Sequence, residues 1–230
     1  MRKLELIKIT LCLIFTVTNF LFAEENSSLL NKAAELFQKE KKDIKNFKVE
    51  QEVISKIKES SSSVTEKRIQ VGYYKYPDEY IFICKEIELN GIKQILAKPL
   101  IEKTSKSEVD WLSVEGLKSY SFQSFYSDSK MIKFLVSPNK IQTGYYRGQL
   151  WLDLKTARIL KIFKEPIIKK KEIISYSIEL NFEKDFGYQV PSRTFLSSIY
   201  NINGKTTEVQ VEAAFKNYLF NQDLSQELPK

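Results

Sequence analysis

Histidine is absent from this 230-residue sequence, which also holds only two cysteines and seven glycines. The absence of histidine removes the commonest general base and the commonest metal ligand together. A Gly-rich phosphate loop is missing as well, and carboxylates such as Glu86 and Glu88 alternate with apolar residues as on a solvated strand. We therefore expect no enzymatic activity, no bound metal and no cofactor.

The first 23 residues have the order of a secretory signal. Arg2, Lys3 and Lys8 precede a short apolar run, and Ala23 offers a small residue for cleavage. The apolar run is shorter than the roughly 20 residues that a membrane-spanning helix needs, so an uncleaved anchor is the less favoured alternative. We expect cleavage after Ala23 and an exported mature protein that forms one domain, residues 24–230.

Charge and cysteine content limit the partners of the mature chain. The expected signal holds three bases and one acid, so its removal lowers the formal charge from +7 to +5. The remaining lysines are interleaved with glutamates, which is typical of a solvated surface and argues against a nucleic-acid groove. Cys84 is the only cysteine left after cleavage. It cannot form a disulfide within the chain, and its apolar neighbours predict a buried thiol.

Two helical segments are predicted. Apolar residues recur at three- and four-residue spacing from 29 to 37, after polar residues at 26–28 that can cap a helix. The charged residues that follow leave this helix one apolar stripe, so it should lie across another element. In the segment 107–117, Ser107 and Asp110 are spaced like a capping box, which predicts a short lid helix there.

Strand patterns dominate the rest of the chain. Apolar and polar residues alternate with period two in several segments, most clearly at 47–57, 80–89 and 174–182. Asn90-Gly91 and Asn203-Gly204 are strong signals for two-residue hairpins. The first hairpin pairs Leu89 with Ile92 and Glu88 with Lys93, and the second places Leu196, Ser198 and Tyr200 opposite Val211, Val209 and Thr207. This pattern predicts a long antiparallel sheet with one wet face and helices over its apolar face.

Several motifs occur in an order that resembles a known family. They are Gly148-Gln149-Leu150-Trp151-Leu152-Asp153 followed by Thr156 and Arg158–Lys161, then Tyr188–Ser192, Asn203-Gly204 and Asn217-Tyr218, with Gly72–Tyr76 and Pro77 nearer the N-terminus. This order is similar to that of outer-membrane lipoprotein-sorting proteins, the LolA-like periplasmic carriers. The better match covers residues 145–220, and a weaker one covers 25–90. Turn chemistry and sheet packing also explain Trp151, Asp153 and Asn203-Gly204 without any ligand.

The resemblance implies a mainly β fold, an antiparallel incomplete (half-open) β-barrel whose concave apolar face lies under the N-terminal helix and a short lid helix. It implies a periplasmic monomer that shields the acyl chains of lipidated proteins between an inner-membrane donor and an outer-membrane acceptor. In carriers of this family an arginine ties the lid to the sheet, and Arg68, Arg147, Arg158 and Arg193 are available for that role. Two alternatives stay open: an extracytoplasmic regulatory sensor of lipoproteins with the same fold, and a structural or interaction module without a ligand.

On this basis two groups of residues are singled out. The candidate lining of a lipid cavity consists of Leu29, Ala33, Leu36, Phe37, Val49, Val53, Tyr176, Ile178, Leu180, Phe182, Leu196, Val209 and Val211. The residues expected to shape turns and close contacts are Gly72, Pro77, Gly148, Trp151, Asp153, Asn203 and Gly204.

Overall fold

The computed structural model describes residues 26–75, 79–105, 110–185 and 187–224. The predicted signal, Pro77, Ser107 and the start of the predicted lid lie outside these residues. The N-terminal helix spans residues 26–43, and the short helix α2 spans Val114–Ser119. The strands are β1 Asn46–Glu59, β2 Ser63–Lys75, β3 Glu79–Leu89, β4 Ile92–Gln94, β5 Leu100–Ser105, β6 Tyr120–Ser127, β7 Met131–Pro138, β8 Tyr146–Asp153, β9 Ile159–Pro166, β10 Ile173–Asp185, β11 Tyr188–Ile202 and β12 Lys205–Phe220.

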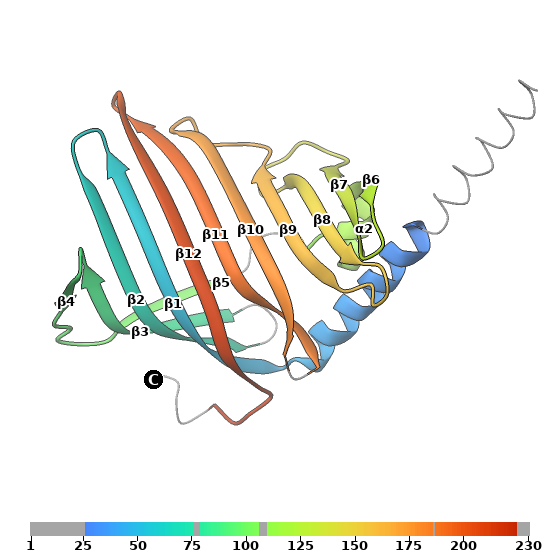
Figure 1. The fold of residues 1–230 in the computed structure, drawn as a ribbon, viewed down its shortest axis with the longest axis horizontal. Coiled ribbons are helices and arrows are strands. Elements are labelled where there is room, and N and C mark those ends of the chain that lie inside the picture. The colour runs from blue at the N-terminus through green and yellow to red at the C-terminus, as the bar shows by residue number, and fades with distance from the viewer. Residues whose placement is uncertain (1–25, 76–78, 106–109, 186, 225–230) are drawn as a thin grey trace, which may run out of the picture.

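All the strands belong to a single antiparallel sheet (Figure 1). The strand order is β4-β3-β2-β1-β12-β11-β10-β9-β8-β7-β6, and β5 pairs with β3 beside β4. The last strand, β12, lies in the middle of the sheet, between β1 and β11. The sheet stays open, and the described part of the chain shows no pairing between the strands at its two ends. The predicted fold class, a mainly β, antiparallel and incomplete barrel with an N-terminal helix, is confirmed.

Both predicted hairpins form with the predicted register. Asn90 and Gly91 have φ of 48° and 83°, and Asn203 and Gly204 have φ of 53° and 78°. Positive φ at both central residues is the type I′ geometry that favours Asn-Gly. Leu89 lies opposite Ile92, and Leu196, Ser198 and Tyr200 lie opposite Val211, Val209 and Thr207.

The second helix differs from its prediction. It begins at Val114, not near Ser107, and its N-cap is Ser113, whose Oγ accepts a hydrogen bond from the Gly116 N–H at 2.9 Å. Trp111 and Leu112, which were expected inside the helix, instead lie in the turn before it with 6% and 2% of their surface exposed. The Ser113 N–H and hydroxyl donate to the Asp110 carbonyl at 3.1 and 2.8 Å, which closes a turn over residues 110–113, so the helix starts only after Ser113.

The main hydrophobic core lies at the β7–β9 end of the sheet. Ala33 and Ala34 of the N-terminal helix pack there with Trp111 and Leu112 against buried side chains of the sheet, which are Ile132, Phe134, Val136, Leu150, Leu152 and Ile159. Two alanines on the contact face let the helix backbone approach the sheet closely. None of the helices in the described residues is long and apolar enough to cross a membrane.

The motif residues of β8 and its following turn have structural roles. Trp151 is half-buried on the sheet surface, where the Nζ atoms of Lys133 and Lys161 lie 5.7 and 5.2 Å from its ring centre. The Asp153 carboxylate accepts hydrogen bonds from the backbone N–H groups of Lys155 and Thr156 at 3.0 and 2.7 Å. Burial by itself raises the pKa of Asp153, but the hydrogen bonds from Thr156 and Lys155 outweigh it and hold the pKa below its usual value.

Gly148 is required by close packing between strands. A Cβ atom at this position would lie 1.9 Å from the Phe163 carbonyl oxygen. We expect Gly148→Ala to lower the free energy of unfolding by about 3 kcal/mol, because the backbones of β8 and β9 would have to separate. The control is Gly144→Ala, where φ is +85° but no atom lies within 4 Å of the added Cβ. There backbone strain alone should cost about 1 kcal/mol. Urea unfolding measures both, and equal losses would contradict the packing argument.

Candidate functional site

The face of the sheet to which the N-terminal helix packs is its inner face. Directly paired residues on neighbouring strands point to the same side of a sheet. The strand pairing therefore shows which residues in the middle of the sheet lie on the inner face. The series of partners runs Leu150, Ile162, Leu180, Thr194, Ala213 and Val53. The inner face of β10, β11, β12 and β1 is therefore continuous with the wall that the helix covers.

The middle of the inner face carries the apolar residues that the sequence placed together. Ile178 pairs with Leu196, and Leu196 pairs with Val211. Tyr176 and Val209 lie opposite each other across Ser198 in the neighbouring row. All the predicted lining residues in this region are half-buried, and the buried clusters found among the described residues do not include them: Val53, Tyr176, Ile178, Leu180, Leu196, Val209 and Val211.

The other candidate lining residues lie in packed regions. Leu29, Leu36 and Phe37 pack around the core formed by Ala33 and its neighbours, and Phe182 joins the same core from β10. Val49 is 2% exposed and packs with Val190 and Tyr218 at the other end of the strands. The structure therefore divides the predicted lining into a packed part and the half-buried row in the middle of the sheet. The prediction that these residues contact lipid stays a prediction.

Sequence patterning missed a polar side of the inner face, at β2 and β3. The Gln70 side-chain N–H donates to the Gln51 side-chain oxygen at 2.6 Å, and Gln51 is only 6% exposed. Arg68, which lies opposite Val53, donates to Glu66 at 2.5 Å and to Glu102 at 3.0 Å. The hydrogen bond that Arg68 donates to Glu66 raises the pKa of Arg68 more than burial lowers it. These residues alternate with apolar ones, which is why they resembled a solvated face.

The predicted buried thiol is confirmed. Cys84 is a free cysteine with 3% of its surface exposed. Burial raises the pKa of its thiol, so the side chain packs as a small neutral group.

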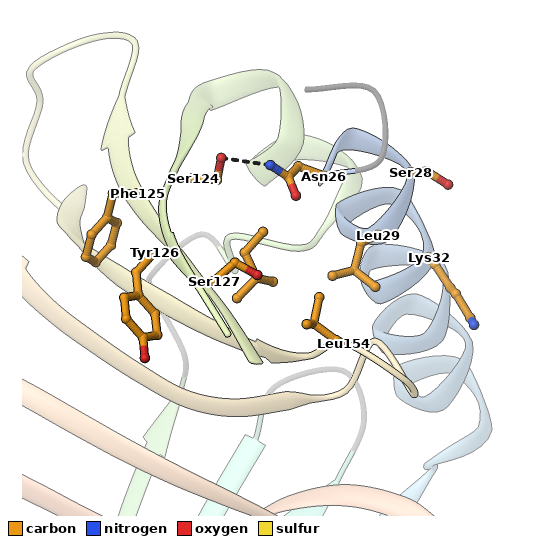
Figure 2. Close-up of a pocket in the computed structure, with 10 residues that line it drawn as sticks. Asn26, Ser28, Leu29, Lys32, Ser124, Phe125, Tyr126, Ser127 and Leu154 are labelled. Carbon is orange, nitrogen blue, oxygen red and sulfur yellow. Dashed lines mark hydrogen bonds between the residues drawn. The ribbon is translucent and has the colours of Figure 1, made fainter. Parts of the chain in front are cut away.

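A cavity of about 830 Å³ lies between the start of the N-terminal helix and the end of β6 (Figure 2). The Asn26 amide donates to the Ser124 hydroxyl at 2.9 Å across the mouth of this cavity, and Leu29 faces Leu154 inside it. Ile132 lines it as well, while Phe125 and Tyr126 are 54% and 44% exposed. Its wall mixes serine, amide and apolar side chains, so it is a less suitable place for an acyl chain than the inner face of the central strands.

The C-terminal turn of the N-terminal helix is tied to the sheet through Glu40. One carboxylate oxygen lies 2.9 Å from the Arg158 Nη1, and the other accepts a hydrogen bond from the Gln189 N–H at 2.8 Å. Nη1 is close enough for an ion pair but lacks hydrogen-bond geometry, and Nη2 of Arg158 donates to the Gly187 carbonyl at 3.3 Å. Of the four arginines considered from the sequence, Arg158 is therefore the one whose described contacts join this helix to the sheet.

Further contacts hold the helix to the segment before α2. Lys41 forms an ion pair with Asp110 at 3.2 Å, and the Gln38 amide donates to the Leu112 carbonyl at 3.1 Å. The helix therefore contacts both the sheet and the loop that packs beside it. No group of three or more potential metal ligands occurs among the described residues.

Arg158→Met is expected to lower the free energy of unfolding by about 1–3 kcal/mol, because it leaves the largely buried Glu40 carboxylate without its cation. The side chains of Arg158 and Glu40 are 20% and 15% exposed. The matched control is Arg147→Met, since Arg147 pairs with Glu165 at 3.5 Å with its side chain 66% exposed. That change should cost no more than about 0.5 kcal/mol. Equal effects in urea unfolding would show that Glu40 does not depend on Arg158.

Comparison with known proteins finds similarity to solved structures. The sequence matches no family model and no curated protein. Among solved structures, the chain is similar to a LolA superfamily protein from Nitrosomonas europaea at 12% identity and a TM-score of 0.44, covering 89% of this chain and 97% of the other. It is also similar to an outer membrane lipoprotein-sorting protein domain from Vibrio parahaemolyticus at 17% identity and a TM-score of 0.43, covering 86% and 96%.

A third similar structure is the MucA/MucB complex of Pseudomonas aeruginosa, at 10% identity and a TM-score of 0.24, covering 85% of this chain and 99% of the other. The matches fall on the group of proteins that the sequence motifs resemble. Since all three TM-scores are below 0.5, we argue function from the residues of this chain alone.

Proposed function

We propose that this chain is an exported lipid-binding protein that shields the acyl chains of lipoproteins on the inner face of its sheet. The observation that carries the proposal is the row of half-buried apolar side chains that Ile178, Leu196 and Val211 form across β10, β11 and β12, and that ends at Ser55 in β1. This row continues from the helix-covered core, yet it belongs to none of the buried clusters of the described residues.

The physical basis is the hydrophobic effect. Each methylene of an acyl chain that is exposed to water costs about 0.8 kcal/mol, so a lipidated protein needs a shield to cross an aqueous compartment. A sheet face lined with Ile, Leu and Val supplies that surface and needs no catalytic group. The polar side of the same face, around Arg68 and Gln51, then lies where the head of a bound lipid can meet hydrogen-bonding groups.

The carrier role requires uptake from a donor membrane and release to an acceptor, which we place at the inner and outer membranes of a cell with a periplasm. In this scheme the N-terminal helix is the lid, and its movement requires the Glu40–Arg158 and Lys41–Asp110 contacts to break. Because Ala33 and Ala34 of the same helix belong to the main core, its movement also requires the contact between the helix and that core to open.

The test is uptake of a fluorescent fatty acid by the chain that begins at Glu24. The proposal predicts saturable uptake that an acylated cysteine peptide displaces. Transfer of that peptide from the loaded protein to acceptor vesicles would support a carrier, whereas retention of the peptide would favour a sensor. Absence of uptake by the folded chain would contradict lipid binding in either role.

Export makes a separate prediction. The basic residues, apolar run and small residue at Ala23 should direct cleavage there. N-terminal sequencing of the protein from the extracytoplasmic fraction should therefore begin at Glu24. Recovery of chains with an intact Met1 in the membrane pellet would contradict the expected processing.

A further inference from the structure

Several connections between strands lie along the same side of the sheet (Figure 1), and besides the turn between β1 and β2 there are three that adjoin one another. They join β7 to β8, β9 to β10 and β11 to β12. The Ile167 N–H donates to the Tyr145 carbonyl at 3.1 Å, and the Asn201 N–H donates to the Glu172 carbonyl at 2.8 Å. These hydrogen bonds hold the three connections next to one another, so residues 139–145, 167–174 and 201–205 form one continuous strip, which we name the rim.

The rim exposes large aliphatic side chains. Ile141 is 78% exposed, Ile168 is 46% exposed, and Ile174 and Ile202 are both 53% exposed. Each connection contributes at least one of them. Single exposed apolar residues are ordinary on protein surfaces, but several isoleucines gathered on adjoining turns mark an interaction site.

The rim is also strongly basic. It contains five exposed lysines and one exposed acid, and these residues are Lys140, Lys169, Lys170, Lys171, Lys205 and Glu172. By comparison, the turns at the other ends of these strands contain both acidic and basic residues. The β6–β7 turn combines Asp128 with Lys130, and the β8–β9 turn combines Asp153 with Lys155. Positive charge is therefore concentrated on one side of the sheet.

We propose that the rim docks this protein on the surface of a lipid bilayer that contains anionic phospholipid. Lysines attract the negatively charged surface, and their flexible stems keep the ammonium groups at the headgroups while isoleucines between them enter the apolar boundary. Aromatic residues are what a nucleic-acid groove uses for stacking, and they are enriched at the anchors of protein interfaces. The exposed apolar tips of the rim are isoleucines, while its Tyr145 is half-buried with its ring stacked on Tyr120, and this arrangement suits a bilayer.

This proposal is independent of what the inner face binds. Docking requires only the rim, so a chain that adheres to vesicles but takes up no fatty acid would retain the rim proposal and lose the proposed function. Uptake of fatty acid without binding to vesicles would retain the proposed function and contradict the rim proposal.

The experiment is co-sedimentation of the chain beginning at Glu24 with vesicles of phosphatidylethanolamine and phosphatidylglycerol. We expect binding that weakens as salt rises and that is much weaker on phosphatidylcholine alone. Each lysine at an anionic surface contributes about fivefold to partitioning, so K169Q/K170Q/K171Q should reduce it on the order of 100-fold. I141S/I168S should reduce binding roughly tenfold by removing apolar insertion, also at high salt.

The matched control is K39Q/K42Q/K155Q, which removes three exposed lysines outside the rim. It loses the same formal charge and should bind vesicles nearly as well as the unchanged chain. Thermal melting checks that all variants remain folded, which surface glutamines should permit. Equal loss in the two triple variants would overturn the proposal, because net charge would then explain the binding. Failure of the unchanged chain to bind anionic vesicles would also overturn the proposal. Release of the bound chain from these vesicles by an added acidic protein that it binds more tightly would overturn it as well.

Discussion

Leu150→Ala is expected to lower the free energy of unfolding by about 3–5 kcal/mol. Leu150 is fully buried in β8 and packs in the core that the N-terminal helix covers. Its removal leaves a cavity between the sheet and the helix, and a core closed on both sides cannot collapse to fill it. Urea unfolding followed by circular dichroism measures the change.

The matched comparison for Leu150→Ala is Ile178→Ala, which truncates a side chain in the middle of the inner face. Ile178 is only half-buried, and it lies outside the buried clusters of the described residues. The same kind of truncation should cost only about 1 kcal/mol there, because fewer packed neighbours are lost. Equal losses at Leu150 and Ile178 would show that the middle of the inner face is ordinary packed core, with no surface left for a lipid.

Ile178→Asn should weaken fatty-acid uptake roughly tenfold or more, because an amide that faces an acyl chain loses its hydrogen bonds to water without gaining new ones. The cost in the free energy of unfolding should stay near about 1–2 kcal/mol, since the side chain is half-buried and keeps some access to water. Binding is followed by titration with a fluorescent fatty acid, and stability by urea unfolding of the same samples.

The control for this substitution is Ser177→Asn. Ser177 is the neighbour of Ile178 along β10, so its side chain points to the opposite face of the sheet, where it lies opposite Ser197. Uptake should be unchanged in this variant. Loss of uptake in both variants, or in neither, would contradict the assignment of binding to the inner face.

Local rules were enough to predict the hairpins and their register. Asn-Gly at 90–91 and 203–204 fixes a type I′ turn, and the two-residue period of the strands then determines which side chains share a face. Leu196 and Val211 could therefore be placed opposite each other from sequence, and the structure confirms it. Alternation along β10 predicts only that Ile178 shares a face with Tyr176 and Leu180, and the structure adds its pairing with Leu196.

Features that depend on distant contacts could not be predicted. Ser107 and Asp110 have the spacing of a helix cap, but the chain forms a turn at 110–113 that buries Trp111 and Leu112, and the helix begins at Val114. The contact of Glu40 with Arg158 joins segments far apart in the chain, and no local motif assigns it to Arg158 among the four candidate arginines. The polar cluster around Arg68 was missed for a related reason, because alternation shows which residues share a face but not what lies over that face.

Mass spectrometry of lipids that co-purify with the mature protein tests the central claim most directly. The account predicts that protein purified from the extracytoplasmic fraction without added lipid carries acylated molecules in near-stoichiometric amounts. It also predicts that Ile178→Asn protein of the same yield carries far less of them, while Ser177→Asn protein carries as much as the unchanged chain. Folded protein that is free of acylated molecules, or an equal load on all three proteins, would contradict the account.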